Sequence, residues 1–233
     1  STPSNSSAAS DVYKRQALKY RICGKKKLKV IYNGIDFDEY NMDYHMNTRE
    51  LLEIPEDAFV VGMVGRLAEQ KAPDVFVKAA KRIKEIIPKA FFLIVGDGPD
   101  WDEVQQEVDD NELTDSFILA GWTRRPMEYI KILDIAVLIS RWEGFGLVLP
   151  EYMMAGKTIV ASEVDAIPNI IQDGQNGLLV RVDDAIDASK AVLQIYREKG
   201  LADRMVAQGM KDVHNKFNAR RVSDEHGKLF ERI

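Results

Sequence analysis

The chain has 233 residues, of which 45% are hydrophobic and 30% are charged, so it can bury a core and is not an intrinsically disordered protein. Its formal net charge of -5 at pH 7 argues against nucleic acid as the main partner, and against an anionic membrane surface held by charge alone. The single cysteine, Cys23, excludes an internal disulfide framework and indicates a reducing compartment, and the apolar runs are too short to predict a transmembrane helix.

The first ten residues differ in composition from the rest of the chain, because five of them are serines and the others include proline and asparagine. The segment 1–16 also lacks the apolar stretch of a signal peptide. We interpret residues 1–16 as a disordered segment or a cloning remnant outside the fold. The residues that follow, 17–29, form a short basic stretch before the first predicted strand.

From residue 58 onward, strand-like and helix-like patterns alternate. Short β-branched and aromatic runs predict strands, and apolar residues recurring every three to four positions predict helices. The predicted strands are 58–65, 91–95, 117–120, 135–139, 158–161 and 177–180. The predicted helices are 74–87, 100–111, 127–131, 148–155, 168–171, 184–199, 202–217 and 220–233. This alternation predicts an α/β fold, a Rossmann-like doubly wound parallel sheet with helices on both faces and further helices at the C-terminus.

Three loops with unusual composition each follow a predicted strand. They begin near Arg66, Gly96 and Glu143. In an open parallel sheet the carboxyl ends of the strands share one edge, and ligands bind in the crevice there. We therefore expect the three loops to meet at one binding edge.

The most informative segment is RWEGFGLVLPE, residues 141–151. A buried apolar strand precedes it, and a helix begins near Val148, with Pro150 in a first turn where a missing N–H does little harm. A strand, a glycine loop and a helix start present free backbone N–H groups to an anion. Glu143 on the loop and Glu151 on the helix could bind hydroxyl-rich groups on either side of a bound phosphate.

Two cations, Arg66 and Lys71, lie between a predicted strand and a predicted helix. A guanidinium offers a planar fork of donors and an ammonium offers a mobile point charge, so the two together suit a diphosphate. Taken alone, they are better interpreted as two solvated surface cations, because that is the commoner fate of these residue types.

The two glutamates separated by seven residues, with Gly144, Phe145 and Gly146 between them, resemble the retaining glycosyltransferases of the two-Rossmann-domain (GT-B) type. The family is the large E-x7-E one, glycosyltransferase family 4-like or group 1, which includes glycogen and sucrose synthases. Companion motifs typical of it occur in the right order, at residues 30–36, 65–71, 93–99 and 171–180. The resemblance extends from residue 29 to the C-terminus, far more than a motif match.

The resemblance divides the chain into two parts. Residues 1–28 are the tail plus a remnant of a preceding domain, and residues 29–233 are a nucleotide-sugar donor-binding domain. In the family, the C-terminal helix crosses back to a first Rossmann domain that holds the acceptor. That acceptor domain is missing here, so the chain is expected to be one half of a GT-B enzyme and inactive on its own.

The resemblance also implies roles for individual residues. Arg66, Lys71 and Glu143 are the expected catalytic residues: the cations stabilise the leaving diphosphate and Glu143 faces the donor sugar. The expected donor-binding residues are Gly65, Arg66, Lys71, Gly121, Trp122, Glu143, Gly144, Phe145, Gly146, Leu147, Val148 and Glu151. No metal or cofactor is expected, because two cations and helix N-termini take the place of a metal ion, and the histidines His45, His214 and His226 have no zinc-binding spacing.

Three of these roles have simpler alternatives. Glu151 could accept hydrogen bonds from ribose hydroxyls, or it could only stabilise the helix dipole. Glu143 could be an exposed loop acid. Trp122 could stack on a nucleobase, or it could be a packing residue.

The implied function is retaining transfer of a sugar from a nucleotide diphosphate sugar, in polysaccharide or glycolipid synthesis. The expected location is cytoplasmic, with peripheral association of the full-length enzyme at the inner membrane face. Two alternatives remain open: a nucleotide-sugar binding module without transferase activity, and a GT-B sugar-nucleotide epimerase. The nucleobase, the sugar and the acceptor are not specified by the sequence.

Overall fold

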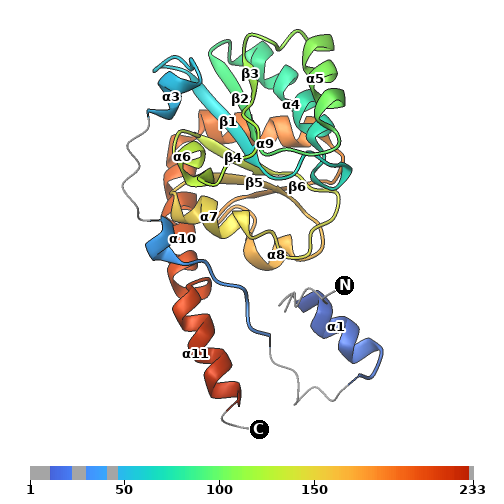
Figure 1. The fold of residues 1–233 in the computed structure, drawn as a ribbon, viewed down its shortest axis with the longest axis vertical. Coiled ribbons are helices and arrows are strands. Elements are labelled where there is room, and N and C mark those ends of the chain that lie inside the picture. The colour runs from blue at the N-terminus through green and yellow to red at the C-terminus, as the bar shows by residue number, and fades with distance from the viewer. Residues whose placement is uncertain (1–10, 23–29, 41–46, 231–233) are drawn as a thin grey trace.

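The computed structural model describes residues 11–22, 30–40 and 47–230, which form a sheet covered by helices (Figure 1). The strands are β1 (Phe59–Val64), β2 (Ala90–Val95), β3 (Phe117–Leu119), β4 (Ile135–Leu138), β5 (Thr158–Ser162) and β6 (Leu178–Val180). They pair in the order β3-β2-β1-β4-β5-β6, and every pairing is parallel. The strand order reverses between β1 and β4, which confirms the predicted doubly wound fold.

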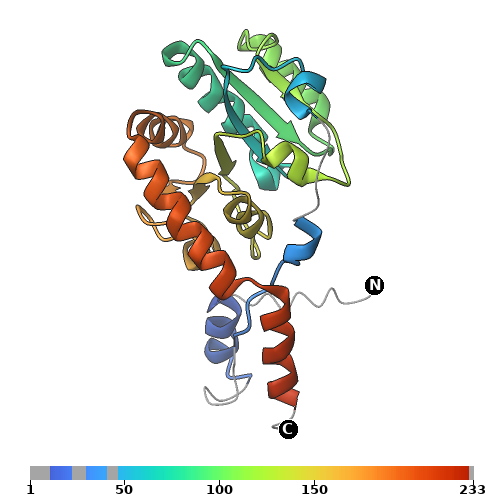
Figure 2. The ribbon, with the colours of Figure 1, turned by 90° about the vertical axis from the view of Figure 1, so that its left-hand side faces the viewer.

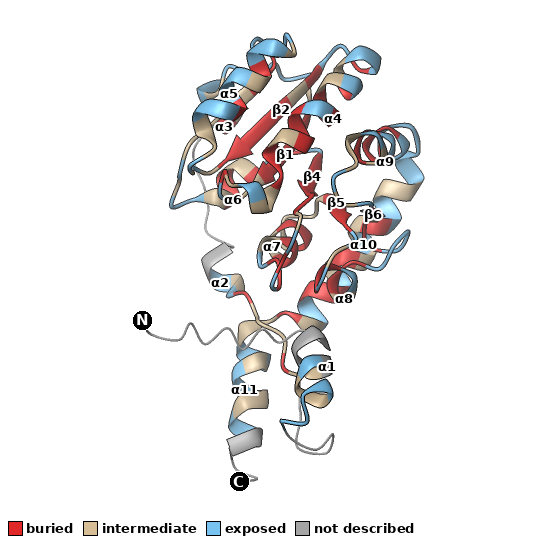
Figure 3. Ribbon diagram, turned by 90° about the vertical axis from the view of Figure 1, so that its right-hand side faces the viewer, coloured by how far each residue is buried: buried red, intermediate tan, exposed pale blue. Residues whose placement is uncertain are grey.

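The helices are α1 (Asp11–Lys19), α2 (Phe37–Tyr40), α3 (Thr48–Leu51), η2 (Glu69–Lys71, a 3-10 turn), α4 (Pro73–Ile86), α5 (Trp101–Asp110), α6 (Pro126–Ile130), α7 (Val148–Met154), α8 (Ile167–Ile170), α9 (Ala185–Arg197), α10 (Lys199–Lys216) and α11 (Ala219–Phe230). Buried residues of α4, α5 and α9 pack on one face of the sheet. Buried residues of α6, α7, α8 and α10 pack on the other face. Figure 3 shows the buried residues concentrated in the strands and on the helix sides that meet them.

Alternating side chains explain the two layers. In β1, Val61 and Met63 belong to the first core cluster while Val60 belongs to the second, because successive residues of a strand point to opposite faces. Both faces are apolar, as expected for a parallel sheet. Helix α11 continues away from the sheet, beyond the end of α10 (Figures 1 and 2). Within the described residues, no helix combines the length and the apolarity that a membrane span requires.

The secondary structure predicted from the sequence differs from the observed one in three respects. Residues 11–16, assigned to a disordered segment, form the first part of α1. The short elements α2, α3 and η2 were not predicted, because four residues or fewer show no periodicity. The break predicted at residues 200–201 is instead at Glu198, between α9 and α10. The interpretations of residues 1–10 and of residues 23–29 lie outside the described part of the chain, as do Cys23 and His45.

One buried hydroxyl joins α7 to the strands at the point where the strand order reverses. The Tyr152 side chain is fully buried, and its hydroxyl accepts a hydrogen bond from the Val64 amide at 2.8 Å. The same hydroxyl donates to the Val137 carbonyl at 3.3 Å. Burial raises the pKa of Tyr152, so the phenol stays protonated and keeps both bonds. Helix α7 is therefore held against the carboxyl-terminal parts of β1 and β4.

We predict that Tyr152→Phe lowers the free energy of unfolding by about 1–3 kcal/mol, because the buried Val64 amide loses its acceptor. The midpoint of urea unfolding should fall while its slope is unchanged. The control is Tyr196→Phe, whose ring is exposed and whose change should stay within about 0.5 kcal/mol. Equal midpoints for both variants would contradict this role of the hydroxyl.

Candidate functional site

Two adjoining cavities open at the carboxyl ends of β1, β2 and β4. The first, which we call the glutamate cavity, has a volume of about 480 Å³ and is lined by Asn33, Val64, Gly65, Lys71, Glu143, Gly144, Phe145, Gly146, Leu147, Val148 and Glu151. The second, which we call the tryptophan cavity, has a volume of about 420 Å³ and is lined by Val64, Gly65, Arg66, Val95, Gly96, Asp97, Trp122, Thr123 and Pro126. They share Val64 and Gly65, so they form two lobes of one site.

The structure brings the sequence-predicted site residues together at these lobes, with one exception. Gly121 lines neither cavity, but its carbonyl accepts a hydrogen bond from the Gly96 amide at 2.9 Å. It therefore ties the loop after β3 to the loop after β2, next to Trp122. Asn33 lines the glutamate cavity but was not predicted, because the motif at residues 30–36 indicated only the start of the domain and Asn33 lies 32 positions before Gly65.

Lys71 and Glu143 form an ion pair inside the glutamate cavity. Their side chains are 16% and 9% exposed, and the Lys71 ammonium contacts the Glu143 carboxylate directly. The Ser140 hydroxyl lies 3.4 Å from the same carboxylate oxygen, and the Glu143 amide donates to the Asp165 carboxylate at 3.0 Å. The alternative of an exposed loop acid is therefore wrong. Removing either partner would leave a buried charge unpaired.

The loop that follows Glu143 reverses the chain into α7. Gly146 adopts a φ of +80°, a conformation that side-chain-bearing residues rarely adopt, and the Leu149 amide bonds back to its carbonyl at 2.9 Å. Helix α7 then starts at Val148, and its first-turn amides have no partner within the helix. Glu151 lies in this first turn and also lines the cavity, so both of its predicted roles are compatible with its position.

Arg141 joins the loop that carries Lys71 to the loop that carries Glu143. Its guanidinium bonds to the carboxylates of Asp74 at 2.8 Å and Asp183 at 2.6 Å, and to the Glu69 carbonyl at 2.9 Å. Its own amide donates to the Gln70 carbonyl at 2.8 Å. Arg141 was not predicted as a site residue, since its partners lie far away along the chain.

Arg66 and Trp122 are exposed at the tryptophan cavity. Arg66 makes no ion pair with any residue that the structure describes, so its guanidinium is available to an anion. The Trp122 ring is 68% exposed, and the Arg124 guanidinium lies 5.9 Å from its centroid. The alternative of a packing tryptophan is therefore wrong.

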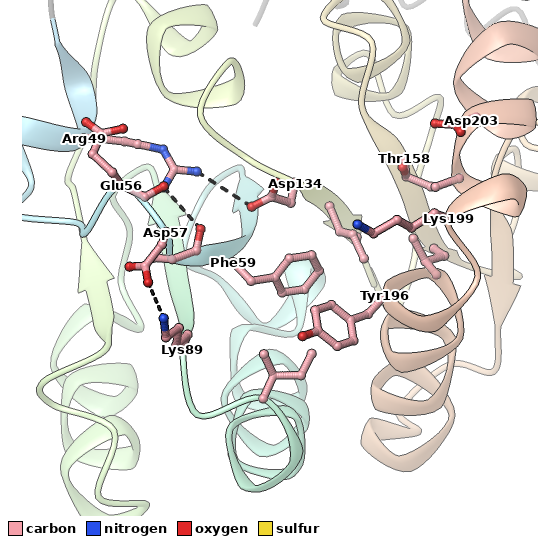
Figure 4. Close-up of a pocket in the computed structure, with 15 residues that line it drawn as sticks. Arg49, Glu56, Asp57, Phe59, Lys89, Asp134, Thr158, Tyr196, Lys199 and Asp203 are labelled. Carbon is pink, nitrogen blue, oxygen red and sulfur yellow. Dashed lines mark hydrogen bonds and ion pairs between the residues drawn. The ribbon is translucent and has the colours of Figure 1, made fainter.

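A further cavity, of about 550 Å³, lies at the opposite end of the sheet (Figure 4). It borders the amino ends of β1, β4 and β5, and four of its charged side chains form two ion pairs with one another. Arg49 contacts Asp134 at 3.7 Å and donates to nearby carbonyls, while Lys89 pairs with Asp57. Because open α/β sheets bind ligands at the carboxyl ends, we place the candidate site in the two lobes instead.

The described residues include no group of three or more His, Cys, Asp or Glu side chains positioned to hold a metal ion. The charged groups that line the site are two cations, Arg66 and Lys71, and three carboxylates, Asp97, Glu143 and Glu151, and the backbone of Leu147 and Val148 lines it at the start of α7. Such a set can bind an anionic ligand that also has hydroxyl groups.

Known proteins resemble the chain in sequence and in fold. The family described as "Glycosyl transferases group 1" matches residues 46–212. The UDP-Gal:alpha-D-GlcNAc-diphosphoundecaprenol alpha-1,3-galactosyltransferase of Escherichia coli is 30% identical over 180 residues, which are 75% of this chain and 46% of that protein. The chain spans about half the length of the curated relatives it matches.

Solved structures share the fold. Anabaena Alr3699/HepE in complex with UDP and glucose has a TM-score of 0.85 at 20% identity, over 97% of this chain and 62% of that chain. The C-terminal domain of a Francisella tularensis group 1 glycosyl transferase, LpcC, has a TM-score of 0.71 at 24% identity, over 79% of this chain and 99% of that domain.

We predict that Arg141→Met lowers the free energy of unfolding at pH 7 by about 1.5–3 kcal/mol, the scale for hydrogen bonds to charged groups. Burial alone would raise the pKa of Asp74, but the hydrogen bond and charge of Arg141 hold that pKa below its ordinary value. A carboxyl with a lowered pKa stabilises the fold above its unfolded pKa, about 3.9, and loses this effect as the pH falls.

The stability difference between wild type and Arg141→Met should therefore shrink below about pH 4. Urea unfolding at pH 7 and at successively lower pH values measures it. Arg82→Met, at an exposed position of α4, is the control and should change stability by no more than about 0.5 kcal/mol. A difference that stays constant down to pH 2 would show that the ion pair with Asp74 does not contribute.

Proposed function

The chain belongs to the group 1 glycosyl transferase family, and from this premise we propose that it is the donor-binding half of a retaining glycosyltransferase that uses a nucleotide diphosphate sugar. The observation that carries the proposal is the two-lobed site, in which the Lys71–Glu143 pair and Arg66 flank the shared Gly65. A diphosphate between the lobes would lie within reach of both cations. The nucleobase would then lie on the Trp122 side and the sugar on the Glu143 side.

The proposed chemistry is cleavage of the bond between the anomeric carbon and the diphosphate oxygen and formation of a bond from that carbon to an acceptor hydroxyl oxygen, whose proton passes to the departing diphosphate. The bonding electrons leave with the diphosphate, whose negative charge grows in the transition state. Arg66, Lys71 and the backbone amides of Leu147 and Val148 stabilise that charge, and preformed donors of this kind are usually the largest catalytic term. We assign no protein nucleophile.

Lys71 has a second task in this proposal. Glu143 would place a negative charge beside the anionic diphosphate, and like charges in a buried site repel strongly. The direct contact with the Lys71 ammonium offsets that repulsion, so the carboxylate can hydrogen-bond to the donor sugar. With these cations present, we propose that the reaction needs no divalent metal.

We further propose that the acceptor is bound by a preceding domain and belongs to polysaccharide or glycolipid synthesis at the cytoplasmic side of a membrane. The name of the Escherichia coli relative, which includes diphosphoundecaprenol, supports a lipid-linked acceptor. The complex of the Anabaena protein with UDP and glucose supports a nucleotide-sugar donor.

We predict that the chain binds UDP, GDP or ADP with a dissociation constant below about 1 mM in the presence of a chelator. Calorimetry would measure this, and Arg66→Gln should weaken binding by about tenfold or more, because a charged hydrogen-bond donor is lost. The matched control is Arg82→Gln. Binding that requires magnesium or manganese would refute the metal-free site.

We predict different effects for the two glutamates. Glu151→Gln should weaken binding of the bare nucleotide by about 1–3 kcal/mol, if its carboxylate accepts hydrogen bonds from the ribose. Glu143→Gln should not weaken binding of the bare nucleotide, because the Lys71 ammonium it leaves unpaired can still bind the diphosphate, but it should weaken binding of the nucleotide sugar. Equal losses for both ligands in both variants would argue against this division.

We predict that the chain alone transfers no sugar. Positioning two reactants contributes about 7–11 kcal/mol in well-oriented systems, and the described site accounts only for the donor. Incubation with radiolabelled UDP-, GDP- and ADP-sugars and a panel of lipid and oligosaccharide acceptors tests this. Robust turnover without a second protein would mean that the acceptor site lies within this chain.

A further inference from the structure

Three aromatic rings from distant parts of the chain meet beside the glutamate cavity. Tyr32 lies 6.1 Å from Phe145 and 6.0 Å from Phe217, and Phe145 lies 6.1 Å from Phe217, all measured between ring centroids. Phe145 is 6% exposed and Phe217 is fully buried. These distances are within the range of favourable aromatic pairs. We call these three residues the ring cluster.

The segment 30–36 crosses the junction between α10 and α11 (Figures 1 and 2), where Ile35 pairs with Asn218. Tyr32 of the ring cluster belongs to this segment, and Phe217 belongs to the junction. The Ile35 amide donates to the Phe217 carbonyl at 2.7 Å, and the Ala219 amide donates to the Ile35 carbonyl at 3.0 Å. At Gly34 the two backbones approach so closely that a Cβ atom would lie 2.6 Å from the Cα of Ala219. The crossing is therefore tightly held.

Two neighbouring residues of segment 30–36 connect this crossing to the glutamate cavity. Asn33 lines the glutamate cavity, and Tyr32 packs on Phe145, which belongs to the loop of that cavity. Phe145 lies between two glycines, which do little to restrict the backbone. The buried ring is then the main anchor of the loop between Glu143 and α7.

We propose that Tyr32 and Phe217 are positioning residues, which act through Phe145 to hold the Gly144–Gly146 backbone at the floor of the glutamate cavity. Occupancy of the cavity and the position of segment 30–36 are thereby coupled. The coupling is reciprocal: a ligand that orders the loop also orders the crossing. The identity of that ligand rests on the function proposed above, whereas the positioning of the loop does not.

The first test needs no ligand. Hydrogen exchange of the amides at 144–149 should be faster in Tyr32→Leu than in wild type, by between about twofold and tenfold, and nearly normal in Tyr32→Phe, which keeps the ring. The matched control is Phe37→Leu: Phe37 directly follows the segment 30–36, at the start of α2, and packs on His214 of α10, with ring centroids 4.9 Å apart. Unchanged exchange at 144–149 in Tyr32→Leu, or equal acceleration in Phe37→Leu, would overturn the positioning role.

The second test adds UDP, GDP or ADP. In wild type, saturating nucleotide should slow exchange at 31–36 and 217–219, and Phe145→Leu should abolish this slowing. Tyr32→Leu should bind the nucleotide between about twofold and tenfold more weakly, and Phe37→Leu should bind it normally. Nucleotide binding without any slowing at 31–36 would overturn the coupling. If wild type binds no nucleotide, the proposed function fails, and the first test still decides the role of the ring cluster.

Discussion

The guanidinium of Arg141 joins two distant parts of the chain to the loop after β4: the continuous η2–α4 segment, through the Glu69 carbonyl and Asp74, and the turn before α9, through Asp183. A planar group with five donors suits this task better than the single ammonium of a lysine. Because the two loops that hold Lys71 and Glu143 are locked together, the ion pair inside the glutamate cavity has a fixed geometry. The electrostatic field that a ligand meets in the glutamate cavity depends on that geometry.

A second set of hydrogen bonds, made by residues of β5 and the turn after it, holds the loop that carries Glu143. The Ser162 hydroxyl donates to the Ser140 carbonyl at 2.6 Å, and the Asp165 carboxylate accepts the Glu143 amide. Ser162 is the last residue of β5 and Asp165 lies three residues after it, and β5 is the neighbour of β4 in the sheet. Buried polar groups that are satisfied in this way rigidify a site, whereas unsatisfied ones would cost stability. The loop therefore has a rigid end at Glu143 and a ring-anchored middle at Phe145.

The strands and the long helices could be predicted because hydrophobic periodicity is a local property, visible in a window of one element. The grouping of Arg66, Lys71, Glu143 and Glu151 could be predicted from the rule that parallel strands share their carboxyl edge, together with the family resemblance. The solvent exposure of individual side chains could not be predicted, because it depends on the packing of distant segments. The sequence therefore allowed two interpretations each for Glu143 and Trp122.

The partners of Arg141 and the ring cluster were beyond prediction for a different reason. Asp183 is 42 positions from Arg141, and Tyr32 is far from both Phe145 and Phe217 along the chain. Contacts of this kind are set by how helices pack across the sheet, which no local pattern encodes. Composition also misled at residues 11–16, where a serine-rich neighbourhood obscured the start of α1.

The exposure of Trp122 gives the protein an optical label of its own. An indole changes its emission when water around it is replaced by another aromatic group, and this indole stands at the mouth of the tryptophan cavity. Trp101 lies at the start of α5, partly buried against the core, and contributes a background that a ligand in that cavity would not contact. The third tryptophan, Trp142, is 47% exposed and directly precedes Glu143, so its emission would respond at the other lobe. With Trp142 replaced by phenylalanine, the filling of the tryptophan cavity can be followed by light without attaching a dye.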